Sequence, residues 1–390
     1  MFETLSYSAL QHYWWILVAI LWAALVTMMF VQWWQAIYNR LWKDDEEKSL
    51  ILSAIWKHHK LTFSVLVTFW GAVFASFPVF YATSFGWAYL VWMAILFIFI
   101  IQAVAYEYRS KVSNFLWKKT YDAFLWINGF FWPLLLWVAV ATFFTGSNFQ
   151  IETTNLVDAS ATHHMITTWT TPFYGLEALW NTNQNAFITN IALWLAVALL
   201  VQILALLYII HHIDNKGITD RAVESIKIKS VVFLVVFLTF VYKLLTIKWY
   251  AYDNTWFVSI ESYKYLDNLL DSWITFALFW GGTILVLLGI WLGIFKKSRY
   301  WFWFSALWTF SVVISLFILA WFNNTAFYPS SDLQSSLTIA NASSSHYTLI
   351  VMSYVSLMLP FVIAYIIWAW KTIASKQMTK ATLKKELEVY

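Results

Sequence analysis

Nine stretches of this chain are long and apolar enough to cross a lipid bilayer, and they constrain the fold more than any other feature. They cover residues 12–34, 61–82, 85–106, 122–145, 186–211, 229–249, 272–295, 300–322 and 347–371. A spanning helix needs about 20 mostly apolar residues, and hydrocarbon forces the backbone to satisfy its own hydrogen bonds. We therefore expect an all-α polytopic membrane protein with about nine transmembrane helices.

Composition excludes several other classes of protein. Charged residues make up 11% of the chain and hydrophobic residues 61%, whereas a soluble domain carries about 25% charged residues. A soluble globular enzyme, a disordered or collagen-like chain and a nucleic-acid-binding protein are excluded on this ground. The chain has no cysteine, which excludes disulfides, thiol chemistry and cysteine-ligated metal or iron–sulfur sites.

The distribution of basic residues predicts the orientation. Of the 24 lysines and arginines, 21 lie between segments one and two, three and four, five and six, or seven and eight, or in the C-terminal tail. The loops 146–185 and 323–346 contain none. The positive-inside rule then places the N-terminus outside and the C-terminus in the cytoplasm. We expect one transmembrane helical domain over 1–372 and a cytoplasmic basic tail over 373–390, with the acidic run 44–47 in a solvated loop.

Histidine placement argues against a heme site or a metal site in this chain. The eight histidines are His12, His58, His59, His163, His164, His211, His212 and His346. Six form adjacent pairs, and neighbours on a helix point about 100° apart, so one pair cannot supply both axial ligands on one face. None lies in the middle of a predicted span, where a heme buried in the bilayer would need its ligands. We expect this chain to ligate no heme and no metal.

Intramembrane polar residues are few, which disfavours an ion-coupled transporter. Lys243 is the only lysine or arginine deep in a predicted span; its side chain either reaches the outer interface or meets a partner carboxylate or proton path. Glu107 and Arg109 end the third segment as a basic anchor with a local ion pair, and Asp122 begins the fourth. Gln102, Gln202 and Asn128 are expected to join helices through hydrogen bonds. The residues alone leave open a transporter or a subunit of a larger complex.

Several motifs resemble subunit II of the cytochrome bd quinol oxidases. They are residues 12–15 (HYWW), 75–82 (ASFPVFYA), 108–111 (YRSK), 328–331 (YPSS), 336–339 (SLTI), 343–345 (SSS) and 348–353 (TLIVMS). Those from 328 onward are the most specific, and with the span count the resemblance covers nearly the whole chain. A stand-alone secondary permease and an anchor for another redox complex remain the alternatives.

The resemblance implies a multi-pass protein of the bacterial inner membrane that pairs with a heme-bearing subunit I. In this family, subunit I carries hemes b and d, oxidises quinol at the outer face and reduces dioxygen to water with cytoplasmic protons, so turnover builds a proton gradient. Subunit II supplies scaffold, part of a proton route and in some members a structural quinone; a small accessory subunit is a further expected partner. Membrane lipid and quinol are the other partners implied.

The sequence departs from the family pattern where protons enter. Members often carry a tryptophan–carboxylate pair before span two, and the matching positions here are His59 and Lys60. The family's aspartates in span one have no counterpart in residues 26–32 (VTMMFVQ). A histidine could substitute, because it titrates near neutral pH. The candidate proton-route residues are therefore His58, His59, Lys60, Glu107 and Arg109.

Tryptophan is abundant and glycine scarce, with 28 and 10 residues respectively. The resemblance implies glycine at seven of the tryptophans: Trp33, Trp34, Trp70, Trp87, Trp132, Trp137 and Trp321. Helix contacts in membranes favour small residues, and overpacking costs about 1–3 kcal/mol per site. Two explanations stay open, namely bulky tryptophans that face lipid, or UGA codons that the source organism reads as glycine.

Overall fold

A computed structural model describes residues 2–87, 89–109, 111, 116–152, 167–169, 184–253, 255–296, 300–374 and 377–382. His163 and His164 lie outside the described residues, as do the side chains of Trp87 and Trp137. Helices dominate what is described, so the prediction of an all-α membrane protein is confirmed.

The long helices account for eight continuous candidate spans. They are α1 (Tyr7–Met28) continued by α2 (Phe30–Trp33) and η2 (Trp34–Arg40), α6 (Tyr89–Tyr108), α7 (Lys118–Thr145), α8 (Gln184–His212), α9 (Lys216–Thr246), α11 (Trp273–Phe276) with η6 (Ala277–Gly281) and α12 (Gly282–Lys296), α13 (Trp301–Leu319), and α15 (His346–Ser356) with α16 (Leu359–Ile373). The shorter helical elements are η1 (Phe2–Thr4), α3 (Asp45–Trp56), α4 (His59–Ser76), α5 (Pro78–Tyr81), η3 (Ala82–Trp87), α10 (Lys264–Asp271), η7 (Leu333–Ser335) and α14 (Ile339–Ala342). Two antiparallel hairpins pair β1 (Phe149–Ile151) with β2 (Thr167–Trp169), and β3 (Lys248–Tyr252) with β4 (Val258–Ser262).

The second predicted span is bent rather than straight. Helices α3 and α4 together run over Asp45–Ser76, and the chain then turns by 119° into Pro78–Phe85. Phe77 leaves the helical region, with φ −130° and ψ 64°, because the ring of the next residue, a proline, clashes with a helical residue before it. Pro78 then begins α5, where its missing N–H is no loss. Counting the bent pair as one span gives nine for the described residues.

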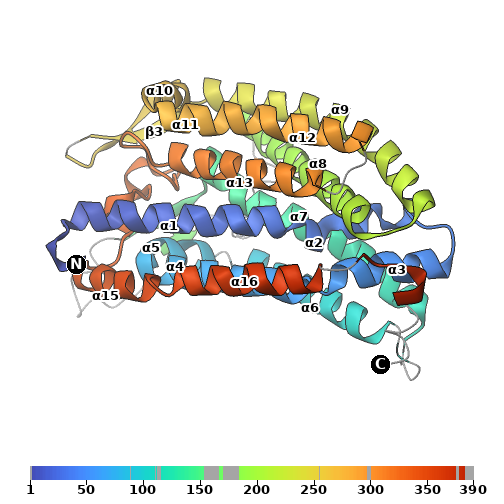
Figure 1. The fold of residues 1–390 in the computed structure, drawn as a ribbon. Coiled ribbons are helices and arrows are strands. Elements are labelled where there is room, and N and C mark those ends of the chain that lie inside the picture. Colours follow the sequence, from blue (N-terminus) through green and yellow to red (C-terminus); the bar gives the residue numbers. More distant parts are fainter. Residues whose placement is uncertain are drawn as a thin grey trace.

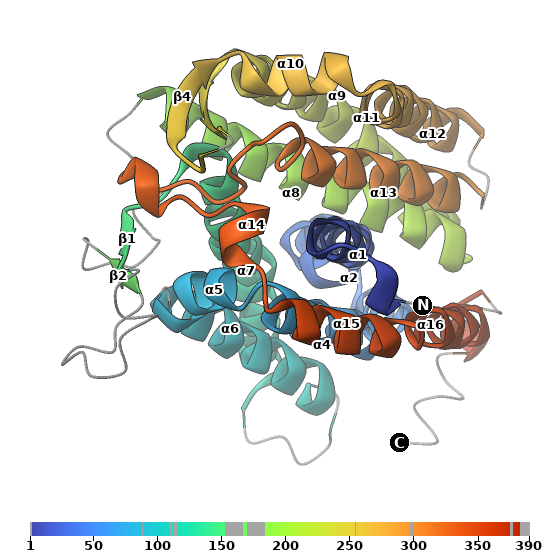
Figure 2. The ribbon, with the colours of Figure 1, turned by 90° about the vertical axis from the view of Figure 1, so that its left-hand side faces the viewer.

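Helix α1 forms the centre of the bundle. Figure 2 shows it end-on, with α8 and α13 on one side, α7 beside it, and α4 and α15 on the other. In the most apolar stretch of this first span 67% of the residues are buried, against 11% in the corresponding stretch of the span His346–Ile373. The first span is thus a core helix, whereas the last one covers the outside.

The two ends of the bundle differ in chemistry, and we call them the basic end and the hairpin end (Figure 1). The basic end, at the right, holds α3, the start of α9 and the described tail residues 377–382. The hairpin end, at the left, holds the N-terminus, β3–β4, α10 and the start of α15. By the charge rule we expect the basic end to face the cytoplasm.

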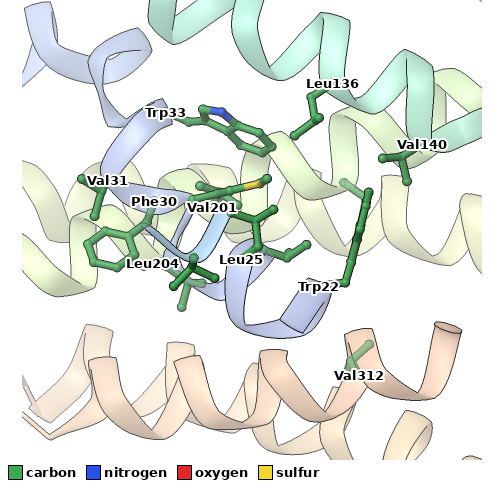
Figure 3. Packing of buried hydrophobic residues seen from close by; sticks show 14 of the residues in the cluster. Trp22, Leu25, Phe30, Val31, Trp33, Leu136, Val140, Val201, Leu204 and Val312 are labelled. Carbon is green, nitrogen blue, oxygen red and sulfur yellow. The ribbon is translucent and has the colours of Figure 1, made fainter. Parts of the chain in front are cut away.

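Buried tryptophans contradict the idea that the surplus rings all face lipid. Trp33 and Trp34 are 0% exposed and Trp132 is 1% exposed. The rings of Trp33 and Trp132 lie 5.7 Å apart, and Figure 3 shows Trp33 packed among core residues. Beside them α7 approaches η2 so closely that a Cβ at Gly129 would lie 2.5 Å from Ala36 N. Lipid exposure is therefore the wrong explanation for these three residues.

Candidate functional site

His58 is a fully enclosed titratable side chain at the basic end. It is 0% exposed and faces α8, where its Nε2 lies 3.2 Å from the hydroxyl of Tyr208. The rings of Trp370 and His212 lie 4.3 Å and 6.4 Å from the His58 ring. This cluster of His58, Tyr208, His212 and Trp370 joins the start of α4, the end of α8 and the end of α16.

His59 faces a different helix. It is 9% exposed, and its ring stacks on Phe99 at 4.8 Å and lies 5.8 Å from the ring of Tyr106, both on α6. The Tyr106 hydroxyl accepts hydrogen bonds from Gln35 Nε2 at 2.5 Å and from Trp34 Nε1 at 3.1 Å. The two adjacent histidines thus diverge, as the helical spacing predicts.

The histidine cluster does not fit a heme held by two histidines. Tyr208 engages the His58 Nε2 atom that would bind iron, and the rings of Tyr208 and Trp370 pack directly on the His58 ring. Across the described residues, no three His, Cys, Asp or Glu side chains are grouped so that they could hold a metal ion.

Arg109 and Asp122 form a buried ion-pair cluster that joins three helices. Arg109 Nε lies 2.7 Å from Asp122 Oδ1, and Lys48 Nζ lies 2.5 Å from Asp122 Oδ2. Arg109 and Lys48 are only 4% and 6% exposed. Two cations on one carboxylate tie α3 and the end of α6 to the start of α7, so Asp122 does more than begin a helix.

The expected local ion pair between Glu107 and Arg109 is wrong. Glu107 lies 4.0 Å from Lys111 at an exposed position, one helical turn away. Residues two apart on a helix point to different sides, which separates Glu107 from Arg109. The structure therefore does not bring Glu107 into the Asp122 cluster.

The acidic run 44–47 is helical rather than a solvated loop. Asp44 caps α3 by accepting a hydrogen bond from the Glu47 N–H at 2.7 Å, a role that aspartate favours at helix starts. Glu47 is 8% exposed and lies 2.6 Å from Arg221 Nη2 at the start of α9. The run therefore docks α3 on α9.

The remaining predicted charges occupy helix ends or the surface. Lys60 is exposed. Lys243 lies in the last turn of α9, because that helix ends at Thr246. A cation there interacts favourably with the helix dipole. A second lysine of α9, Lys229, donates to Gln202 at 2.6 Å. Gln102 and Asn128 donate to the carbonyls of Gln32 and Ile98, so the three predicted polar links between helices are confirmed.

Many of the bonds at the hairpin end are neutral hydrogen bonds from the motifs after residue 328, beside an ion pair between Lys264 and Glu261 at 3.0 Å. Ser330 is fully buried, its hydroxyl donates to the Phe149 carbonyl, and its N–H donates to Ser336 Oγ at 3.0 Å. Thr338 and Asn341 form a reciprocal capping box at the start of α14. These motifs therefore build a cap over the hairpin end, as the polar composition of the loop 323–345 predicts.

Comparisons with known proteins agree with this architecture. The family model described as cytochrome bd terminal oxidase subunit II matches residues 10–373. The cytochrome bd-I ubiquinol oxidase subunit 2 of Escherichia coli K12 is 26% identical over 383 residues, which covers 94% of this chain and 95% of that protein. A probable cytochrome oxidase subunit 2 of Haemophilus influenzae is 29% identical over 38% of this chain and 39% of its own length.

A solved structure shows the same fold at low sequence identity. The bd oxidase of Geobacillus thermodenitrificans contains a chain that matches with a TM-score of 0.57 and 11% identity, covering 93% of this chain and 98% of that chain. The chain is a multi-pass membrane protein and a subunit of a quinol-oxidising enzyme complex. It belongs to the cytochrome bd terminal oxidase subunit II family.

Proposed function

We propose that this chain is the subunit of the oxidase that binds none of its hemes, and that it scaffolds a subunit I holding hemes b and d. The observation that carries the proposal is the family match over residues 10–373. The aromatic packing around His58 supports it. The proposal includes one domain over 1–372, a tail over 373–390, an outer N-terminus and a cytoplasmic C-terminus. Nothing in the comparisons supports a stand-alone permease.

Purification of the tagged chain from its native membrane tests this proposal. We expect a second polytopic subunit to co-purify and the complex to show the absorption bands of hemes b and d. The chain purified without subunit I should show none of these bands. A monomer that transports a solute, or heme bands in the isolated chain, would contradict the proposal.

We further propose that His59 takes part in proton uptake from the basic end. It lies next to the exposed Lys60, and its ring faces the Tyr106 side chain, whose hydroxyl continues to Gln35. A histidine ring can both accept and donate a hydrogen bond through its two nitrogens, so it can link neighbouring polar groups. His58 would offer a parallel step to Tyr208. Arg109 and Glu107 stay outside this route, because Arg109 is paired with Asp122 and Glu107 lies at the surface.

Substitution of the histidines separates this route from a structural role. We expect His59→Phe to lower both oxygen consumption and proton uptake, and His58→Phe with His59→Phe to lower them further, at an unchanged heme content. His12→Phe is the matched control, because His12 packs on Trp321 at the hairpin end, with rings 4.8 Å apart. Unchanged oxygen consumption and proton uptake in the double variant would disprove the route.

The quinol substrate, a structural quinone and a small accessory subunit are also proposed. Quinone extraction from the purified complex and the masses of its subunits test them directly. Absence of both extracted quinone and a third polypeptide would remove these two components from the proposal while leaving the subunit I pairing intact.

A further inference from the structure

A large apolar cavity lies at the basic end, between the junction of α1 and α2, the start of α13 and the end of α16. Its volume is about 700 Å³, and Met28, Phe302, Ala306 and Ile366 form much of its wall. Binding sites for small molecules in proteins span roughly 300–1,000 Å³ and are mostly apolar. The cavity is therefore large enough for a ligand and has the chemistry of one that is mainly hydrocarbon.

The cavity runs from the membrane-facing surface into the bundle. At one side its wall includes Ile367 and Trp303, which are 50% and 44% exposed, whereas Phe30 and Phe302 are 1% and 2% exposed. A slot of this form admits a chain from the surrounding hydrocarbon. Water gains little there, because an apolar wall gives it few hydrogen-bond partners.

A cationic side chain marks where the head of such a ligand would lie. Lys371, in the last turn of α16, lines the cavity and is exposed. The preceding residue, Trp370, is 6% exposed and its ring forms part of the apolar wall. The charged end of a ligand in the cavity would therefore lie at this lysine.

The charge of this end favours an anionic head group. Lysines and arginines gather at the basic end, and the cytoplasmic leaflet carries anionic lipids that attract such residues by about 1 kcal/mol for each basic side chain. Basic pockets between transmembrane helices on that side bind phospholipid head groups. Charge complementarity therefore favours an anionic phospholipid over a neutral isoprenoid.

We propose that this cavity is a binding site for one anionic phospholipid of the inner leaflet. One acyl chain occupies the slot between α1, α13 and α16, and the phosphate lies beside Lys371. The bound lipid thereby fixes α16, whose span is mostly exposed, against the core helix α1. The proposal is independent of the histidine proton route.

Native mass spectrometry of the purified oxidase complex, with lipid extraction, tests the site. We expect the wild-type complex to retain one anionic phospholipid after detergent washing. Ala306→Phe places an aromatic ring inside the slot where the acyl chain would lie, and should strongly reduce retention. Ala364→Phe is its matched control, because Ala364 is exposed on α16 and does not line the cavity; it should leave retention unchanged.

Head-group variants keep the proposal testable if Ala306→Phe prevents assembly. Lys371→Gln should weaken retention of the anionic lipid by about five-fold, the factor for one basic side chain, and leave zwitterionic lipid unaffected. Lys371→Arg keeps the positive charge and should leave retention of the anionic lipid unchanged. Retention of a quinone, equal retention of zwitterionic lipid, or a lipid-free complex in which subunit I fills the cavity would each overturn the proposal.

Discussion

The basic end and the hairpin end hold the same helices together by different chemistry. At the basic end, Asp122 joins Lys48 and Arg109, and Glu47 joins Arg221, in largely buried ion pairs. At the hairpin end, Ser330, Ser336, Thr338 and their neighbours use hydrogen bonds between neutral groups.

The two kinds of bond differ in how much stability is lost when one partner is removed. A buried ion pair leaves a charge without compensation when one partner is lost, at a cost of about 3–5 kcal/mol. A buried neutral hydrogen bond leaves only a polar group unsatisfied, at about 1–3 kcal/mol. The basic end should therefore be the more sensitive of the two to single substitutions.

Removal of Asp122 should have the largest effect. Asp122→Ala leaves the two buried cations Lys48 and Arg109 without their carboxylate, and we expect a loss of about 3–5 kcal/mol. Thermal unfolding of the purified complex measures it. Glu107→Ala is the matched control, because the exposed pair with Lys111 contributes about 0–1 kcal/mol. Equal unfolding temperatures for the two variants would contradict the comparison.

Removal of the Ser330 hydroxyl should have an intermediate effect. Ser330→Ala takes the donor from the buried Phe149 carbonyl and the acceptor from the Asp332 N–H, and we expect about 1–3 kcal/mol. Faster proteolysis at the hairpin end would show it. Ser331→Ala changes the neighbouring, exposed hydroxyl and should leave proteolysis unchanged; a matching increase would show that the network is not the cause.

Trp256 is a position where a substitution should stabilise the folded β3–β4 turn. It lies in the β3–β4 turn with φ 66°, a left-handed conformation that costs a non-glycine residue about 1–2 kcal/mol. Trp256→Gly removes this strain but loses the ring contact with Tyr252, so we expect a net gain of about 1 kcal/mol. Slower amide exchange at Tyr252 and Val258 would show the gain. Phe257→Gly, at the neighbouring exposed residue without positive φ, should speed exchange instead.

The buried tryptophans distinguish the two origins of the tryptophan surplus. If the source organism reads UGA as glycine, peptides from the native protein contain glycine at the buried positions 33, 34 and 132. Peptide mass spectrometry measures this directly. Tryptophan at positions 33 and 34 in the native protein would exclude the codon explanation.

Lowering the pH should have the smallest effect on stability, and this effect should be confined to the β3–β4 turn. The Asp253 carboxylate accepts hydrogen bonds from the Thr255 side chain and the Phe257 N–H, which hold the pKa of Asp253 below its ordinary value of 3.8. A carboxyl group with a lowered folded pKa stabilises the turn above that ordinary value, and the contribution is lost as pH falls through the folded pKa. The protection factor of the Phe257 amide, which is its exchange rate corrected for the intrinsic pH dependence of exchange, should fall at acidic pH. Asp253→Asn should remove this pH dependence, and its persistence would assign it to another group.

Much of the fold was predictable from the sequence because hydrocarbon permits few solutions. Length and apolarity of each segment locate the spans, and Pro78 marks the one bend. The start of α9 was misplaced, because residues 216–228 are polar enough to look like a loop but continue the helix into the basic end. A polar segment at a helix end carries no hydropathy signal that separates it from a loop.

The candidate site was only partly predictable. Helical spacing anticipated that His58 and His59 diverge, since that depends on neighbouring positions alone. Tyr208, Trp370 and Lys48 were missed as partners because each comes from a distant segment: Tyr208 is 150 residues from His58, and Asp122 is 74 residues from Lys48. The sequence does show Asp122 as a carboxylate at the start of a span, on the same side of the membrane as many basic residues. It does not show which of these basic residues pairs with Asp122, because the partners are far away in the chain.

The central place of α1 has a consequence for the order of biosynthesis. It precedes the other described spans in the chain, yet it contacts α14 and α15: Gln11 bonds Ser343, 332 residues away, and Trp14 bonds Ser353, 339 residues away. Contacts so distant in sequence form late. The nascent chain must therefore hold this deeply buried helix in the membrane without these neighbours until α15 has been made.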